Sequence, residues 1–154
     1  HPRYPYHLLR EEMQEFILDK LQLLIERKLI KGIGENGTEY TVIAQILDLP
    51  KEILRLIQKF DFTKKNPKLI YINTGETMIS LQDSILVTFL NLAGFDILFF
   101  VPTGYQSVEN YFAEKLMEEH QIGEYKYDMQ VPDLNNISTN STRPSWRRKL
   151  FRRG

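Results

Sequence analysis

The run from Asp96 to Val101, which is continuously apolar after its first residue, is the feature that most constrains the fold. Its residues, Asp-Ile-Leu-Phe-Phe-Val, show no alternation of polar and apolar side chains. Such runs are typical of strands that are covered on both faces, as in parallel sheets flanked by helices. The run therefore predicts a central strand of an α/β sheet.

A second strand is predicted upstream of this run. Residues 69–72, Leu-Ile-Tyr-Ile, are apolar and mostly β-branched or aromatic, and a turn follows at residues 74–75. Ser80 can cap the next helix together with Asp83, three positions later. Apolar residues then recur at helical spacing until Gly94. This segment reads as one complete βα unit.

The central run is followed by the same kind of pattern. The turn at residues 102–105 breaks the strand, and Ser107 can cap another helix. The apolar residues that repeat there at helical spacing are Val108, Tyr111, Phe112 and Leu116. Strands separated by helices form parallel pairs through right-handed crossovers. Two βα units therefore predict a parallel sheet.

The first 60 or so residues read as helical. An apolar stripe predicts a long helix from Leu8 to Lys31, which Gly32 ends in a left-handed conformation. Two shorter helices are predicted over residues 40–47 and 51–60, the second with Pro50 at its start. The amino-terminal section should pack beside the sheet.

A third strand is predicted over residues 124–131, where polar and apolar side chains alternate. Such a half-exposed strand suits the margin of the sheet. The predicted fold is thus α/β, with a small, mostly parallel sheet of three or more strands flanked by helices. Residues 1–66 form its helical section and residues 67–132 its α/β core, packed as one domain. Residues 133–154 form a linker and a basic tail.

Composition narrows the class of protein. Hydrophobic residues make up 42% and charged residues 26% of the chain, and cysteine is absent. The chain therefore has no disulfide, thiolate metal site or thiol nucleophile, and a cytoplasmic setting fits best. No apolar run approaches the roughly 20 residues that cross a bilayer, so no membrane partner is expected. The start at His1, without methionine, suggests that the chain was cut from something longer or carries a tag remnant.

The carboxyl edge of the predicted sheet is the candidate ligand site, because turns after parallel strands emerge together there. Backbone amides and hydroxyls at two helix starts suit a small anion, a phosphate or a carboxylate. Gly75 and Gly104 should lie near each other, with Thr103 and Tyr105 turned toward a cleft. The candidate residues are Thr74, Gly75, Glu76, Thr103, Gly104, Tyr105, Ser107 and Glu109. The simpler interpretation is that the glycines serve tight turns and the acids favour helix dipoles.

The residues indicate no particular chemistry beyond this edge. His1 and His7 lie near the amino terminus, and His120 is expected to end a helix. They suggest no metal cluster, no catalytic triad can be argued from spacing, and the question of a cofactor stays open. Catalytic residues and enzymatic activity are left open.

Nucleic-acid binding is the alternative that basic residues raise. Lys51, Arg55 and Lys59 share a face of a helix in a helix-turn-helix-like segment. Arg147 and Arg148 belong to a tail, residues 143–154, that holds six bases and no acid. The rest has 14 of the 20 bases against 20 acids, a net charge of −6. An acidic body opposes phosphate contacts, so a solvated helix face is favoured.

Three stretches carry a resemblance to a known family. They are Phe60-Asp61-Phe62-Thr63, Pro67-Lys68-Leu69-Ile70-Tyr71-Ile72, and Phe89 to Tyr105 with Glu109 following. Over about residues 60 to 112 the chain resembles the carboxy-terminal part of the biosynthetic-module component of tellurite-resistance-type stress operons in Gram-positive bacteria.

The resemblance implies a cytoplasmic protein several times longer than this chain, working beside stress-operon proteins. The leading interpretation is a non-catalytic module of that protein, which binds a ligand or its other domains. A second makes the chain part of an enzyme active site completed by a missing amino-terminal region, and a third is nucleic-acid binding.

Overall fold

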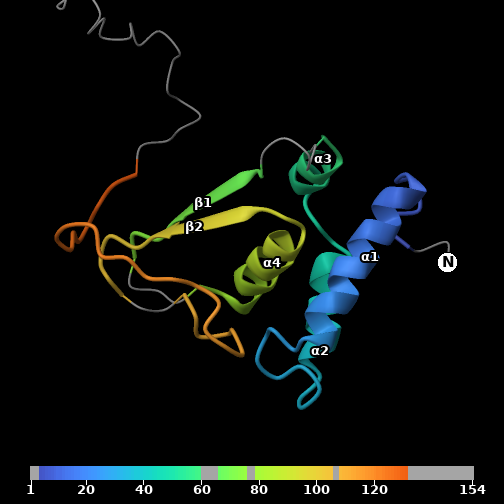
Figure 1. Cartoon of the computed structure of the whole chain (residues 1–154), viewed down its shortest axis with the longest axis horizontal. Coiled ribbons are helices and arrows are strands. Elements are labelled where there is room, and N and C mark those ends of the chain that lie inside the picture. The colour runs from blue at the N-terminus through green and yellow to red at the C-terminus, as the bar shows by residue number, and fades with distance from the viewer. Residues whose placement is uncertain (1–3, 60–65, 76–78, 106–107, 132–154) are drawn as a thin grey trace, which may run out of the picture.

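The computed structural model describes residues 4–59, 66–75, 79–105 and 108–131 (Figure 1). Helices and strands mix along this part of the chain. In order they are α1 (Glu11–Glu26), α2 (Thr38–Ile46), α3 (Lys51–Lys59), β1 (Lys68–Ile72), α4 (Leu81–Leu92) and β2 (Asp96–Phe100). The predicted helical section and the β-α-β unit are thus both present.

The two strands form a parallel sheet. Lys68 pairs with Asp96 at one end and Ile72 with Phe100 at the other. Helix α4 connects the strands, and Ser80 caps it by accepting a hydrogen bond from the Asp83 amide at 3.0 Å. The parallel pairing and the cap are confirmed as predicted from the sequence. Within the described residues the sheet has two strands rather than three or more.

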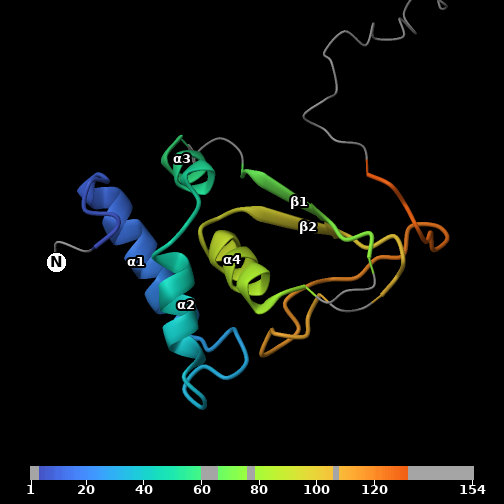
Figure 2. The ribbon, with the colours of Figure 1, turned by 180° about the vertical axis from the view of Figure 1, so that it is seen from behind.

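Helix α4 lies between the sheet and the amino-terminal helices (Figures 1 and 2). It packs against β2 on one side and against α1 and α2 on the other. Its residues Ile85, Phe89 and Leu90 are fully buried, and so are residues of α1 and α2. The order of layers is therefore sheet, α4, then α1 with α2, and α4 forms the centre of the core.

Tyr6 ties the amino-terminal segment to the end of α2. Its hydroxyl donates to the Ile46 carbonyl at 2.6 Å and accepts from the Leu49 amide at 2.8 Å. The side chain is buried, so one bond satisfies a carbonyl that the end of α2 leaves unpaired and the other satisfies an amide in the connection to α3. Burial is also the main reason that the pKa of Tyr6 is raised.

Helix α1 is shorter than its apolar stripe predicted. It begins at Glu11 and ends at Glu26, whereas the prediction ran from Leu8 to Lys31. Lys28 has a φ of 51°, so the chain leaves the helical conformation there rather than at Gly32. The apolar residues beyond this point, such as Ile30, belong to the buried core without being helical.

The helix predicted after Ser107 is wrong in the described residues. Residues 108–111 form a turn, and Phe112 bridges Ile30 in antiparallel fashion. The Lys31 amide donates to the Tyr111 carbonyl and the Ala113 amide to the Leu29 carbonyl, each at 2.9 Å. These long-range backbone bonds replace the helical ones that the apolar spacing predicted. His120 likewise lies in a loop and does not end a helix.

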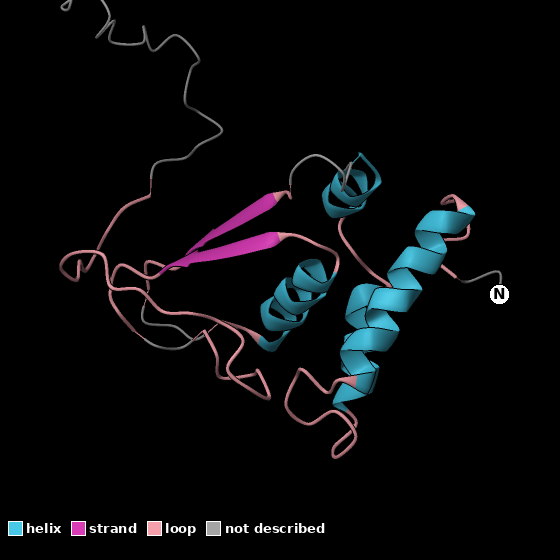
Figure 3. Ribbon diagram, in the orientation of Figure 1, coloured by secondary structure: helices cyan, strands magenta, loops and turns pink. Residues whose placement is uncertain are grey.

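The third strand predicted over residues 124–131 is also wrong. This segment is loop (Figure 3). Asp128 has a φ of 55°, which breaks an extended chain, and the Lys126 amide donates to the Pro102 carbonyl at 2.8 Å. The segment therefore contacts the turn after β2 instead of pairing along a strand. Residues 133–154, the predicted linker and tail, lie outside the described residues.

Candidate functional site

Alternate residues of β1 and β2 turn one face of the sheet toward α4. Leu69, Ile97 and Phe99 on this inner face pack against the buried core. The ring of Tyr71 lies on the same face, 5.2 Å from the ring of Phe99 between centroids. The inner face is therefore part of the core.

The opposite face of the sheet is apolar and open. Ile70, Ile72, Leu98 and Phe100 are 56%, 39%, 49% and 46% exposed, and we call these four side chains the outer sheet face. The strand register places Ile70 beside Leu98 and Ile72 beside Phe100, so they form one two-by-two patch. The prediction that β2 is covered on both faces is thus wrong for the described residues.

The turns after the two strands lie at the same edge of the sheet. Ile72 pairs with Phe100, and the Asn73 amide donates to the Phe100 carbonyl at 2.9 Å. Thr74 and Gly75 therefore emerge next to the turn that contains Thr103. The Gly75 amide donates to the Asn73 side-chain oxygen at 3.2 Å. Two further candidates, Glu76 and Ser107, lie outside the described residues.

The turn after β2 is closed by the chain itself. Thr103 is 7% exposed, and its hydroxyl accepts from the Tyr105 amide at 3.4 Å, so it does not project into an open cleft as predicted. Gly104 has a φ of +69°, and a Cβ there would overlap the ring of Tyr125. The positive φ and the packing of Tyr125 both require glycine. The structure thus accounts for these two residues without a ligand.

The other candidates of this turn are placed differently. Tyr105 is 52% exposed. Glu109 is half-buried, and its carboxylate accepts from the Met117 amide at 3.3 Å. Glu109 therefore orders the loop that follows and does not sit in the first turn of a helix.

A polar cluster of Tyr71, Ser80 and Asp83, of which the sequence analysis singled out only the two capping residues, lies between β1 and the start of α4. Burial, a hydrogen bond with Asp83 and the Asp83 charge raise the pKa of Tyr71 to about 12. The Ser80 hydroxyl donates to the same carboxylate at 2.7 Å. The side chains of Ser80 and Tyr71 therefore both form hydrogen bonds with the Asp83 carboxylate. The capping pattern pointed to Asp83, but nothing in the sequence marked Tyr71 as its partner.

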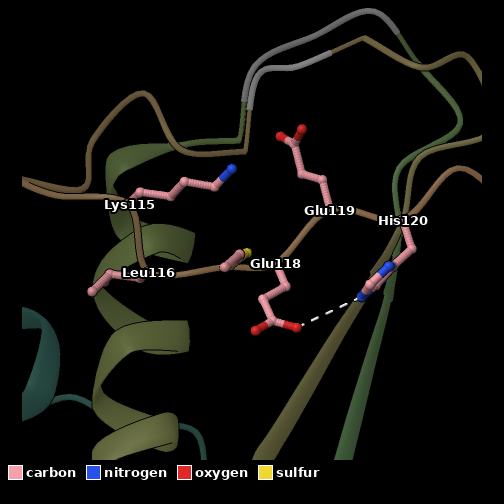
Figure 4. Close-up of a pocket in the computed structure, with 6 residues that line it drawn as sticks. Lys115, Leu116, Glu118, Glu119 and His120 are labelled. Atoms are coloured by element: carbon pink, nitrogen blue, oxygen red, sulfur yellow. Dashed lines mark ion pairs between the residues drawn. The ribbon is translucent and has the colours of Figure 1, made fainter.

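A surface pocket lies in the loop after the Phe112 bridge (Figure 4). It is lined by six consecutive residues, Lys115 to His120. His120 Nε2 lies 3.7 Å from Glu118 Oε2, with side chains 76% and 92% exposed. Water screens such a pair. Because one exposed loop supplies the whole lining, the pocket offers little that would bind a ligand selectively.

The basic residues of the nucleic-acid hypothesis are only partly placed. Lys51, Arg55 and Lys59 are exposed on α3. Their exposure fits a solvated helix face and a phosphate-binding face equally well. Arg147 and Arg148 lie outside the described residues.

Comparison with known sequences identifies the family. A sequence model of the YceG domain matches residues 2–142. The chain belongs to the YceG domain family. It is also 31% identical, over 93 residues, to a Bacillus subtilis (strain 168) protein described as uncharacterized protein YceG. That alignment spans 58% of this chain but 17% of the relative. No solved structure gives a match.

Membership of the YceG family corrects the resemblance drawn from the sequence. The YceG family is a different family from the biosynthetic-module components of tellurite-resistance-type operons. Neither match links the chain to tellurite resistance or a stress response, so the function inferred through that resemblance, a stress-response module, is wrong.

The described residues also bear on metal binding and on membrane spanning. In that part of the chain no group of three or more His, Asp or Glu side chains could hold a metal ion. No described helix is both long and apolar enough to cross a membrane.

Proposed function

We propose that this YceG-family chain is an assembly module of a longer polypeptide, and that its outer sheet face binds another segment of that polypeptide. The observation that carries the proposal is the two-by-two patch of Ile70, Ile72, Leu98 and Phe100, about half exposed on a parallel sheet. Parallel sheets occur almost always with both faces covered. A partner for the open face is therefore expected.

The size of the patch favours a partner within the same polypeptide. Burying one such side chain fully contributes about 1.5–3 kcal/mol, so the remaining half of four side chains contributes about 3–6 kcal/mol. A free partner loses about 4–15 kcal/mol of translational and rotational freedom on binding. A segment of the same chain avoids most of that loss because it is held at high effective concentration.

The length of the relative supports the same choice. The aligned region makes up 17% of the Bacillus subtilis protein, so most of that polypeptide lies outside the match. A longer polypeptide of this kind has ample chain to cover one sheet face. A cytoplasmic location fits the composition, which lacks cysteine, and forms part of the proposal.

The test is a pair of matched substitutions in the longer polypeptide, Leu98→Lys and Leu18→Lys. Both leucines are about equally exposed in this chain, at 49% and 44%, but Leu18 lies on α1, away from the sheet. Leu98→Lys should lower the free energy of unfolding by about 3 kcal/mol or more, since it removes apolar contact and buries a charge. Leu18→Lys should change it by about 0.5 kcal/mol or less.

Equal effects of the two substitutions would overturn the proposal. So would a 154-residue chain that forms a dimer in solution which Leu98→Lys dissociates, because the face would then bind a second copy.

A small anion at the carboxyl edge is a second candidate. It is favoured by the parallel pairing, which brings Thr74, Gly75 and exposed Tyr105 to one edge. Inorganic phosphate should then raise the Tm of the chain, and a Tyr105→Phe variant should respond less. An unchanged Tm over millimolar phosphate would remove this candidate.

A further inference from the structure

The shape of the outer sheet face indicates what kind of segment covers it. Two strands lie about 5 Å apart, and a helix with its side chains is about 10 Å wide, so one helix spans the patch. At the amino end of the strands, Lys68 and Asp96 form an exposed ion pair on the same face. The patch is thus apolar in its middle and charged at one rim. An amphipathic helix matches that pattern.

The edges of the sheet indicate where a strand connected to such a helix could pair. Among the described residues, neither β1 nor β2 pairs with a strand other than its neighbour. The Asn73 amide and the Asp96 amide point into the sheet, to the carbonyls of Phe100 and Pro67. Successive backbone groups of a strand point to opposite sides, so the Ile70 and Ile72 amides point out of the free edge of β1. Such an open, apolar edge is a template for another strand.

The handedness of crossovers selects one of the two edges. A crossover between parallel strands is right-handed in nearly all proteins, and α4 covers the inner face on the way from β1 to β2. The described residues between β2 and residue 131 contain no helix, so the covering helix must come from farther along the polypeptide. A crossover that leads from β2 over the outer face must run in the opposite direction to the first one. The strand that follows this helix is then placed next to β1, at the edge of the sheet away from β2. The chain that precedes β1 contains α1 and α2. Both helices pack against α4, on the inner side of the sheet, so they leave the outer face open.

We propose that the outer sheet face is covered by an amphipathic helix of the longer polypeptide, in a crossover that leads from β2 to a further parallel strand beside β1. The inference rests on the assembly function proposed above and names its partner. The sheet then continues past β1, and both of its faces are covered.

Residue-resolved amide hydrogen exchange in the longer polypeptide tests the added strand. The Leu98 and Phe100 amides, which point toward β1, serve as the internal reference for paired groups. The Ile70 and Ile72 amides should exchange within about tenfold of that reference, because they are bonded to the added strand. Exchange that is more than about tenfold faster at both positions would overturn the inference.

The edge of β2 and the substitutions above separate the possible failures. Slow exchange at Ile97 and Phe99, with fast exchange at Ile70 and Ile72, places the strand on the wrong edge and also overturns it. If Leu98→Lys is costly while the Ile70 and Ile72 amides exchange fast, the face is covered but not by this crossover. If Leu98→Lys is harmless as well, the assembly function itself fails.

Discussion

The inner and outer faces of the sheet are built from the same kinds of residue and have opposite surroundings. On the inner face Leu69, Ile97 and Phe99 pack against the core around α4. On the outer face the neighbouring residues, among them Leu98 and Phe100, are about half exposed. Strand composition is therefore alike for the packed face and for the open face. It does not record which of the two faces another segment covers.

The largest expected effect contrasts the core with the outer face. Phe89→Ala should destabilise the 154-residue chain by about 3–5 kcal/mol, because Phe89 of α4 is fully buried in the core. Phe100→Ala should cost about 1 kcal/mol or less in the same chain, since its ring is 46% exposed. Urea unfolding measures both. A Phe100→Ala cost near that of Phe89→Ala would show that the outer face is already packed.

The next effect concerns the carboxyl edge, which the chain closes with its own Tyr125. Gly104→Ala should cost about 1–3 kcal/mol, because the new Cβ meets the Tyr125 ring at a φ of +69°. Gly123→Ala is the matched control, with a φ of +95° and nothing within 4 Å of the Cβ. Thermal unfolding of both variants isolates the contribution of the ring. Equal costs would show that Tyr125 does not close this turn.

These contrasts mark how far the sequence could predict the structure. Strands β1 and β2, their parallel pairing and the Ser80 cap followed from local pattern, whereas the strand predicted over residues 124–131 is absent. The regions after β2 did not follow from local pattern, because backbone bonds from Lys31 to Tyr111 and from Lys126 to Pro102 link residues far apart in the chain. The spacing of apolar residues along the sequence carries no information about such long-range backbone bonds.

The candidate site was predicted only in outline. Parallel topology placed Thr74 and Thr103 at one edge, but the burial of Thr103 and the ring over Gly104 depend on tertiary contacts. The open outer face was missed because a continuous apolar strand predicts cover on both sides. That cover is absent from the described residues.

A smaller effect probes the inner face through the titration of Tyr71. Its pKa is raised to about 12 by burial, the hydrogen bond with Asp83 and the Asp83 charge. Because the folded state holds this proton more tightly than the unfolded one, at 10.0, stability should fall as pH rises from about 10 to about 12. Asp83→Asn should lower the pKa of Tyr71 and reduce that fall. Ultraviolet titration with pH-dependent unfolding checks this, and an unchanged tyrosine titration would contradict it.

The smallest effect lies at the rim of the outer face. Lys68 and Asp96 form an ion pair with side chains 71% and 51% exposed. Lys68→Ala should therefore change the stability of the 154-residue chain by about 1 kcal/mol or less, and added salt should reduce the difference. Unfolding at low and high salt measures it. A larger loss of stability that does not depend on salt would mean that the aliphatic part of the Lys68 side chain packs on the sheet.

The most direct test of the central claim is the accessibility of the outer sheet face in the longer polypeptide. This chain has no cysteine, so Leu98→Cys and Leu18→Cys each place one thiol in it at similar exposure. Labelling with a soluble thiol reagent, read by peptide mass spectrometry, should modify both positions in the 154-residue chain. In the longer polypeptide the thiol at position 98 should be protected, while that at position 18 stays reactive. Equal reactivity at the two positions in the longer polypeptide would contradict the account.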